Sequence, residues 1–367
     1  MHGATDMNRQ LGGNGDLKKL RVAVAGCGKA GQELHLKSLS GMRDLASVVA
    51  VCDLNLELAK GAARSYGVGS AFQSLGELLN AEKPDAVFIC TPPDTHEAMA
   101  IEAIEAGCHV FCEKPMALDA QSCERMIRAA EKKGVKLTVN HNQRFQPAFL
   151  EAQRVLKGGE MGEVIDARIT YLLRRASYID EAHWAIRMRG SIMVDFFPHQ
   201  VYLAMALMGT MTAVSAEAWK WMGLPWLKYD TFRFTFFGKS FDTTSFVAHG
   251  TESWAYLIDI ACKRGRIIVD MFNSTVVLDR LKSLKIIDKN IHQANLAGQL
   301  VWKSLATGVR PDYKRWSITH KAIARAFLEC ITNDTDPPVP PQEGMEAVRV
   351  TNEAIDVLES KGIRNPD

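Results

Sequence analysis

The sequence predicts an α/β protein of two domains: an N-terminal doubly wound parallel sheet, then an α+β domain with an open, mostly antiparallel sheet. Three observations predict this fold. The 367 residues exceed the roughly 250–300 that a single core usually holds. Short apolar runs alternate with amphipathic stretches up to about residue 140, and apolar and polar residues then alternate with period two. We therefore expect a flexible tail over 1–19, a first domain over 20–140 and a second over 141–367.

The N-terminal part contains five near-continuous apolar runs with helical candidates between them. The runs are 21–25, 48–52, 86–90, 108–112 and 135–139, and the helical candidates are 29–41, 55–66, 74–80, 95–106 and 119–134. Such a pattern is typical of a parallel sheet that helices cover on both faces. Right-handed crossovers make it a doubly wound sheet.

The second part begins with a helical candidate and continues with half-exposed strands. Strand candidates are 164–171, 212–220, 231–237, 243–249, 266–270 and 275–279, and helical candidates are 147–157, 191–207, 317–332 and 344–360. This order predicts a sheet with one face covered by helices. We expect the last two helices to pack back on the first domain.

Composition excludes several classes of function. Lys and Arg total 44 against 42 Asp and Glu, so nothing favours a nucleic-acid or anionic-membrane partner. No run approaches the ~18 apolar residues of a membrane helix, and the polar start is no secretory signal. The eight cysteines form no C-x-x-C pair, so no metal site is expected. We expect a cytoplasmic protein.

A glycine-rich turn follows the first apolar run. Gly26-Cys27-Gly28-Lys29-Ala30-Gly31 lies between that run and the first helical candidate. The glycines allow a tight turn, close approach of the backbone to a pyrophosphate and close packing of helix on strand. The helix N-terminus also offers free N–H groups to the phosphates. The motif in this context predicts a dinucleotide-binding Rossmann domain.

An acid at the end of the second run indicates the cofactor. Asp53 follows Gly31 at about the spacing of 20 residues at which an acid binds the ribose hydroxyls. Its charge would repel a 2′-phosphate, which favours NAD over NADP. Asp53 is alternatively a surface acid that ends a strand, and Arg64 keeps NADP open.

Two further segments follow predicted strands at the carboxyl edge, where open α/β sheets bind ligands. Thr91-Pro92-Pro93-Asp94-Thr95-His96 is either a wall for the cofactor or a Pro-stiffened turn that caps the next helix. In Glu113-Lys114-Pro115, the lysine is a candidate to donate a proton or hydrogen bond to a substrate oxygen. A structural role for Lys114 stays open.

Asp195 and His199 supply the second half of the predicted site. Residues four apart on a helix share a face, so carboxylate and imidazole can converge on one ligand. Histidine suits acceptance of an alcohol proton near neutral pH. An i,i+4 pair that merely stabilises the helix is the alternative. The apolar neighbours predict a buried helix start, where an unpaired carboxylate would be costly.

The combination of these motifs resembles the glucose–fructose oxidoreductase/inositol dehydrogenase/rhizopine-catabolism (Gfo/Idh/MocA) family. Thr91-Pro92, His96 and Asn142-Gln143-Arg144-Phe145 also match its pattern, and the resemblance covers nearly the whole chain from about Leu20. This sequence departs from the family pattern at two places. Arg189-Gly190-Ser191 stands where the family often has Gly-Gly-Gly, and Pro198 precedes His199 where Gly-x-His is common. These changes put the substrate in doubt more than the reaction class.

The resemblance implies NAD, a sugar, sugar-acid or cyclitol substrate, and a homodimer or homotetramer that uses the open sheet. Carried over, Lys114 steadies the reacting hydroxyl, His199 is the general acid/base and Asp195 is its helper. The implied cofactor contacts are Gly26, Gly28, Lys29, Ala30, Gly31, Asp53, Thr91, Pro92, His96, Glu113, Lys114 and Asn142.

We therefore predict hydride transfer between a secondary alcohol and the nicotinamide. Candidates for substrate recognition are Arg144, His183, Trp184, Arg187, Trp226 and Tyr229, although packing roles are as plausible for each. Three alternatives stay open: an NAD-dependent glycosidase with transient sugar oxidation, a non-catalytic NAD-binding sugar sensor, and reduction of a ketone or imine.

Overall fold

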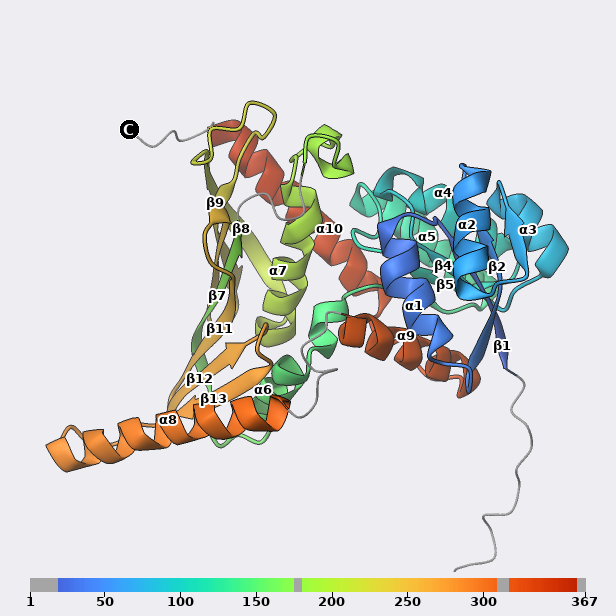
Figure 1. Cartoon of the computed structure of the whole chain (residues 1–367). Coiled ribbons are helices and arrows are strands. Elements are labelled where there is room, and N and C mark those ends of the chain that lie inside the picture. Colours follow the sequence, from blue (N-terminus) through green and yellow to red (C-terminus); the bar gives the residue numbers. More distant parts are fainter. Residues whose placement is uncertain (1–18, 175–179, 309–316, 362–367) are drawn as a thin grey trace, which may run out of the picture.

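The fold is described from a computed structural model, which places residues 19–174, 180–308 and 317–361. Two sheets stand beside each other, each with its own layer of helices (Figure 1). The predicted fold class is confirmed. Except for Lys19, the predicted N-terminal tail lies outside the described residues. In the described part of the chain, no helix is both long and apolar enough to cross a membrane.

The first sheet has six parallel strands in the order β3-β2-β1-β4-β5-β6. They are β1 (Leu20–Ala25), β2 (Ala46–Cys52), β3 (Ser70–Phe72), β4 (Ala86–Ile89), β5 (His109–Cys112) and β6 (Leu137–Val139). The central strands β1 and β4 are almost wholly buried, because helices cover both faces. Sequence analysis missed β3, whose three half-buried residues give no apolar run.

Helices connect these strands, and several begin and end at residues suited to caps. They are Ala30–Leu36 (a π-helix) running into α1 (Lys37–Ser40), α2 (Leu56–Tyr66), α3 (Leu75–Glu82), the 3-10 turn Pro93–Thr95 leading into α4 (His96–Glu105), and α5 (Ala120–Lys133). In α5, the Asp119 carboxylate accepts from the backbone N–H of Ser122 at 2.7 Å, and Gly134 ends the helix with φ 66°.

The second sheet has seven strands in the order β13-β12-β11-β7-β10-β9-β8. They are β7 (Val164–Arg174), β8 (Met211–Trp219), β9 (Thr231–Gly238), β10 (Thr243–Thr251), β11 (Ala255–Cys262), β12 (Gly265–Asp270) and β13 (Thr275–Asp279). All neighbours are antiparallel except β7 and β10. Sequence analysis missed β11, although its alternate residues Tyr256, Ile258 and Ile260 are fully buried.

One helix fills the inner face of the second sheet. α7 (Met193–Met208) packs through Phe197 on Phe234 of β9, with ring centroids 4.1 Å apart. Around it lie the 3-10 turns Asn142–Phe145 and Trp184–Arg187, and α6 (Pro147–Lys157). The long helix α8 (Ile286–Gly308), which sequence analysis did not predict, runs along the edge at β13.

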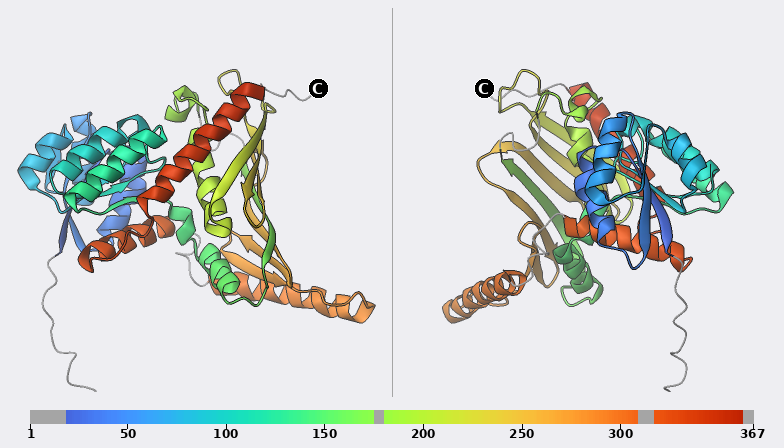
Figure 2. Two further views of the ribbon diagram at one scale, coloured as in Figure 1. Left: turned by 180° about the vertical axis from the view of Figure 1, so that it is seen from behind. Right: turned by 45° about the vertical axis from the view of Figure 1, so that its right-hand side comes forward.

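The two closing helices pack against the first half, and the last one also reaches the second. Phe327 of α9 (Ser317–Thr332) contacts Phe88 and Phe111 of the first sheet, at 6.0 and 5.6 Å between ring centroids. α10 (Pro341–Lys361) contributes Val348 to the first core and Ile355 to the second. α10 therefore bridges the two halves, whereas α9 packs on the first (Figure 2). This packing brings the ends of β4 and β5 toward the start of α7.

Candidate functional site

The glycine turn has the shape that a pyrophosphate needs. Gly26 has φ 92°, and a Cβ there would lie 2.8 Å from the carbonyl carbon of Cys90. A Cβ on Gly31 would lie 1.9 Å from the oxygen of Gly26, whereas one on Gly28 would meet nothing within 4 Å. The fold itself therefore requires glycine at positions 26 and 31, whereas the space beside Gly28 is open. The helix begins beside that space at Lys29 and Ala30, so its N-terminal amides fit a phosphate.

Asp53 lies directly after β2 and holds this turn. Its carboxylate accepts from the backbone N–H of Cys27 at 2.8 Å and from that of Asn55 at 2.9 Å. Each carboxylate oxygen can accept more than one hydrogen bond, so ribose hydroxyls can still bind. The residues present fit a dinucleotide.

His96 joins the two segments that follow β4 and β5. Its ring is fully buried, with Nδ1 2.9 Å from the carbonyl oxygen of Pro115 and Nε2 2.8 Å from that of Thr91. The Thr91 hydroxyl accepts from Thr95 at 2.7 Å, and the Thr95 hydroxyl also lies 2.8 Å from the carbonyl oxygen of Pro92. Within the described structure, His96 therefore fixes the walls of the site, and its contact with a cofactor stays a prediction.

Glu113 anchors the segment that carries the candidate lysine. Its carboxylate lies 2.5 Å from His35 Nε2 and accepts from Asn140 at 2.7 Å and from the backbone N–H of Lys114 at 3.0 Å. Burial acts to raise the pKa of Glu113, but hydrogen bonding and charge from His35 outweigh it and hold the pKa well below its usual range. The Lys114–Pro115 peptide bond is cis.

Lys114 and Asp195 meet across the boundary between the two halves. The Lys114 ammonium donates to the carboxylate Oδ1 of Asp195 at 2.6 Å and to its backbone oxygen at 2.7 Å. The two side chains are only 13% and 21% exposed. Burial acts to raise the pKa of Asp195, but the charge and hydrogen bond of Lys114 outweigh it, with help from His183 and His199, and lower the pKa.

His199 lies one turn along α7 from Asp195. Burial, followed by the charge of Lys114, lowers the pKa of the His199 imidazole from 6.5 to about 3. The ring is therefore neutral at pH 7, which is the state that can accept a proton. Its Nδ1 lies 2.5 Å from the hydroxyl oxygen of Tyr202.

Tyr202 connects His199 to the segment between the two halves. The phenol accepts from the backbone N–H of Gln143 at 3.2 Å and donates to Asn142 Oδ1 at 3.4 Å. The Asn142 amide in turn donates to Thr319 of α9 at 2.8 Å. The ring of His141 stacks on Tyr202, with centroids 4.2 Å apart. Sequence analysis missed Tyr202, whose only signal is its position three residues after His199.

The predicted substrate residues divide into two groups. His183 and Trp184 lie at the site: His183 Nε2 is 4.0 Å from Asp195 Oδ2, and the two aromatic rings are 5.5 Å apart. Arg187 is exposed at the end of the same turn. In contrast, Arg144 pairs with Glu343 of α10.

Trp226 and Tyr229 belong to the second core. Trp226 is half-buried against that core, and Tyr229 is buried with its ring 5.8 Å from Phe232. Their observed contacts are those of packing residues.

The replacement of the family's Gly-Gly-Gly run by Arg189-Gly190-Ser191 affects the backbone at Ser191. Ser191 occupies the position where the family pattern has glycine, and it has φ 51°, a conformation that glycine adopts more readily. Its buried hydroxyl has no hydrogen-bond partner among the residues that the structure describes. The departure therefore lies at the start of α7, one turn before Asp195.

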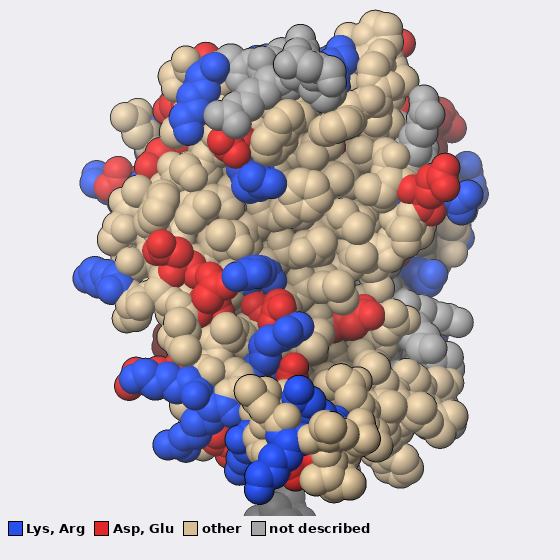
Figure 3. All heavy atoms as spheres, turned by 90° about the vertical axis from the view of Figure 1, so that its left-hand side faces the viewer, with Lys and Arg blue, Asp and Glu red and all other residues tan. Residues whose placement is uncertain are grey.

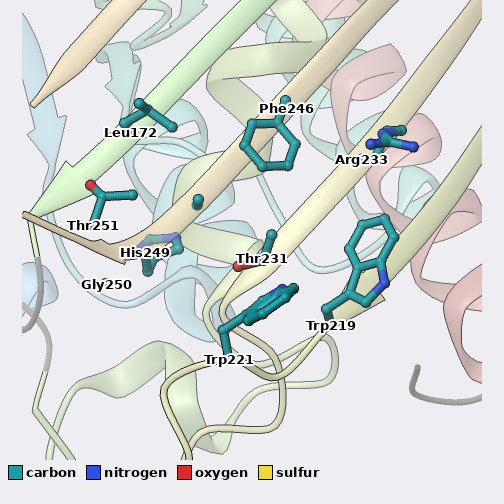
Figure 4. A pocket seen from close by; sticks show the side chains of 10 residues that line it. Leu172, Trp219, Trp221, Thr231, Arg233, Phe246, His249, Gly250 and Thr251 are labelled. Atoms are coloured by element: carbon teal, nitrogen blue, oxygen red, sulfur yellow. The ribbon is translucent and has the colours of Figure 1, made fainter. Parts of the chain in front are cut away.

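A hollow of about 520 Å³ lies elsewhere, on the outer face of the second sheet (Figure 4). Its lining includes Trp219, Trp221, Arg233 and Phe246. Trp219, Arg233 and Phe246 alternate along their strands with the inward-facing core residues, and Trp221 follows the end of β8. None of the predicted site residues lines it. Among the described residues, no group of three His, Cys, Asp or Glu could hold a metal ion.

Comparisons with known proteins agree with this architecture. The profile of an oxidoreductase family with an NAD-binding Rossmann fold matches residues 20–141, and that of the GFO/IDH/MocA C-terminal domain matches 149–256. The D-glucoside 3-dehydrogenase of Escherichia coli is 31% identical over 204 residues, which are 54% of this chain and 57% of the relative. The inositol 2-dehydrogenase of Rhizobium meliloti is 33% identical over 201 residues, 54% of this chain and 58% of the relative.

The matched region thus spans a little over half the length of these curated relatives. A crystal structure of an oxidoreductase from Agrobacterium radiobacter, in complex with NAD+, L-tartaric acid and magnesium, has a TM-score of 0.79 at 16% identity. It covers 94% of this chain and 97% of the other, and at this identity it shows the fold alone. Residues 20–141 form an NAD-binding Rossmann domain. Because the two profiles follow one another and together match well over half of the chain, this protein belongs to the GFO/IDH/MocA oxidoreductase family.

Proposed function

We propose that this protein is an NAD-dependent oxidoreductase that transfers a hydride between a secondary alcohol of a sugar, sugar derivative or cyclitol and the nicotinamide. The observation that carries the proposal is the convergence of Lys114, from the carboxyl edge of the first sheet, with Asp195 and His199 of α7. The names of the relatives, a glucoside and an inositol dehydrogenase, support the substrate class.

His199 is the proposed general base. NAD, when bound, supplies the hydride acceptor, and the protein has to remove the hydroxyl proton. The low pKa of about 3 keeps His199 neutral, so one ring nitrogen holds a lone pair at neutral pH. In the reverse direction the protonated ring returns the proton to the oxygen.

The hydrogen-bond network indicates which nitrogen holds that lone pair. The Tyr202 hydroxyl has one hydrogen and also accepts from Gln143. If the phenol donates that hydrogen to the buried amide oxygen of Asn142, it has none left for His199. The short contact with His199 is then a hydrogen bond only when Nδ1 donates to the phenol oxygen. If the hydrogen went to Nδ1 instead, the amide oxygen would lose this donor, which is costly in a buried site. We therefore assign the proton to Nδ1 and the lone pair to Nε2, which faces the reaction.

Lys114 is proposed to bind the reacting oxygen. An ammonium group has three N–H donors, and Asp195 receives two of them in the described structure. The third can donate to the alcohol oxygen and stabilise the negative charge that develops as the proton leaves. Asp195 keeps the ammonium in place and, through its charge, offsets the desolvation of both groups.

The remaining contacts follow the positions of the side chains. We assign the cofactor to the glycine turn, Asp53 and the walls that His96 joins, with Asn142 near the nicotinamide. His183 and Trp184 are the proposed substrate contacts beside Asp195. The exposed Arg187 is proposed to bind an acidic group of the substrate. Arg144, which is paired with Glu343, is proposed to act on the substrate only indirectly.

We also propose that the protein works in the cytoplasm as a homodimer or homotetramer. The outer face of the second sheet presents a broad area of uncharged side chains, in the upper half of Figure 3. Phe237 and Leu257, which alternate along β9 and β11 with inward-facing core residues, remain 37% and 36% exposed. Apolar surface of this kind is typical of an interface between proteins.

The test is a screen of aldoses, inositols, uronic acids and glycosides for NADH formation. We expect His199→Ala to lower kcat on the best substrate by about 10²–10⁴-fold, the usual contribution of general acid–base catalysis. Unchanged turnover in that variant would remove His199 from the mechanism. Cleavage of a glycoside without net NADH would identify an NAD-dependent glycosidase, and ligand binding without any turnover would identify a sensor.

A further inference from the structure

Helix α8 projects from the edge of the second sheet, on the side of its outer face (Figures 1 and 2). Its position is fixed by β13: the Gln299 amide accepts from the backbone N–H of Leu278 at 2.9 Å and donates to its carbonyl at 3.0 Å. His292 lies 2.9 Å from Asp279 of the same strand. These contacts use one side of the helix, and the opposite side is exposed.

That opposite side carries an apolar seam, which we call the α8 stripe. It consists of Ile287, Ile291, Ala294, Gly298, Val301 and Leu305. All six are exposed, and the four larger side chains are 60% to 63% exposed. Their spacing alternates between four and three residues, which is the spacing of a helix seam that faces another helix. Between Lys289 and Lys303, α8 carries no Asp, Glu, Lys or Arg, unlike an ordinary solvent-facing helix.

We propose that the α8 stripe pairs with α8 of a second copy of this chain, antiparallel and about a two-fold axis. A two-fold interface must be complementary to itself. The α8 stripe is complementary to itself, because small residues lie at its centre and large residues lie at equal distances on both sides. An antiparallel pair places Ala294 against Gly298 of the partner subunit and Ile291 against Val301 of the partner subunit. The small centre lets the two backbones approach closely, and the large residues close the seam at both ends.

This pairing rests on the homo-oligomer proposed above and says where its subunits hold each other. A helix of 23 residues is roughly 34 Å long at 1.5 Å per residue. The seam alone falls short of the roughly 1,200–2,000 Å² that a stable interface buries. The outer face of the adjoining sheet, on the side to which α8 projects, also carries exposed apolar residues such as Phe237 and Leu257. The α8 pair is therefore one part of a larger proposed contact that includes this face.

The test measures the oligomeric state of the whole chain by sedimentation over a range of concentrations. Ile291→Asp places a carboxylate inside the seam in both subunits, and we expect it to weaken self-association by about 100-fold or more. The tetramer would become a dimer, or the dimer a monomer. The matched control is Gln293→Asp, which adds the same charge to an exposed position beside the stripe and should change nothing. Circular dichroism of both variants verifies that α8 remains folded.

A covalent test fixes the orientation. With Ala294→Cys and Gly298→Cys in one chain, we expect mild oxidation to link two subunits, whereas Gln293→Cys should not. The eight native cysteines are buried and should not compete. A wild-type oligomer unaffected by Ile291→Asp would overturn the α8 pairing and leave the homo-oligomer standing. A monomer at all concentrations would overturn both. NADH formation, measured separately, tests the proposed reaction independently of either result.

Discussion

The two halves of the candidate site are built in different ways. The dinucleotide half is made by the backbone: a turn of three glycines between β1 and the first helix, within six consecutive residues. The reacting half is made by side chains that meet across the molecule, with Lys114 and Asp195 separated by 81 positions. A backbone site should be sensitive to any added Cβ, and a side-chain site to loss of a single polar atom. The predictions below test this difference.

The largest effect is expected at the glycine turn. Gly31→Ala would place a Cβ 1.9 Å from the oxygen of Gly26, so the turn has to move. We expect the protein without cofactor to lose about 3 kcal/mol of stability, the upper end of the usual cost of overpacking, because the clash is with backbone. Chemical denaturation measures it. The matched control is Gly28→Ala, whose Cβ meets nothing within 4 Å.

That control separates folding from binding. Gly28→Ala should leave the melting temperature of the free protein unchanged and still weaken NAD binding, because a methyl group then occupies the space reserved for the pyrophosphate. Equal melting temperatures for Gly31→Ala and wild type would contradict the interpretation that Gly31 is required by the fold itself.

The same difference explains what could be predicted from the sequence. The glycine turn was predictable because its strand, turn and helix are adjacent in the chain. Lys114 and Asp195 were predicted separately, but their ion pair depends on how two domains pack, which periodicity does not report. The pairing of Arg144 with Glu343 could not be predicted, because the two residues are 199 positions apart in the chain. α8 escaped prediction although its stripe has helical spacing, because apolar residues outside the stripe, such as Leu296, Leu300 and Trp302, blur the contrast between an apolar and a polar face.

A smaller effect is expected from the protonation of His199 as the pH falls. The folded imidazole has a pKa of about 3, whereas 6.5 is the ordinary value that applies in the unfolded chain. Between these values the unfolded chain binds the proton preferentially, so stability is full above pH 6.5 and decreases as the pH falls toward 3. At pH 5 this effect lowers the free energy of unfolding by about 2 kcal/mol relative to its value above pH 6.5.

The measurement compares wild type with His199→Gln by denaturation at pH 7.5 and pH 5, because other buried histidines such as His141 and His249 add to the total slope. The difference in stability between the two proteins should shift in favour of the variant by that amount at the lower pH. An identical pH dependence would mean that His199 titrates normally in the folded protein.

The smallest effect is expected at Tyr202, which touches the reacting half through a single hydroxyl. Tyr202→Phe keeps the ring that stacks on His141 and removes the hydroxyl, which lies against His199 Nδ1 and also bonds Gln143 and Asn142. Loss of its bond to His199 corresponds to about tenfold in kcat, with little change in KM, because the tautomer is no longer fixed while the binding contacts remain. The matched control is Tyr256→Phe: its phenol is equally buried and donates to Gln143, but it does not touch His199. Equal kcat values for the two variants would assign Tyr202 to packing, whereas a loss confined to Tyr202→Phe would show that the side-chain half of the site depends on the second layer that holds its base.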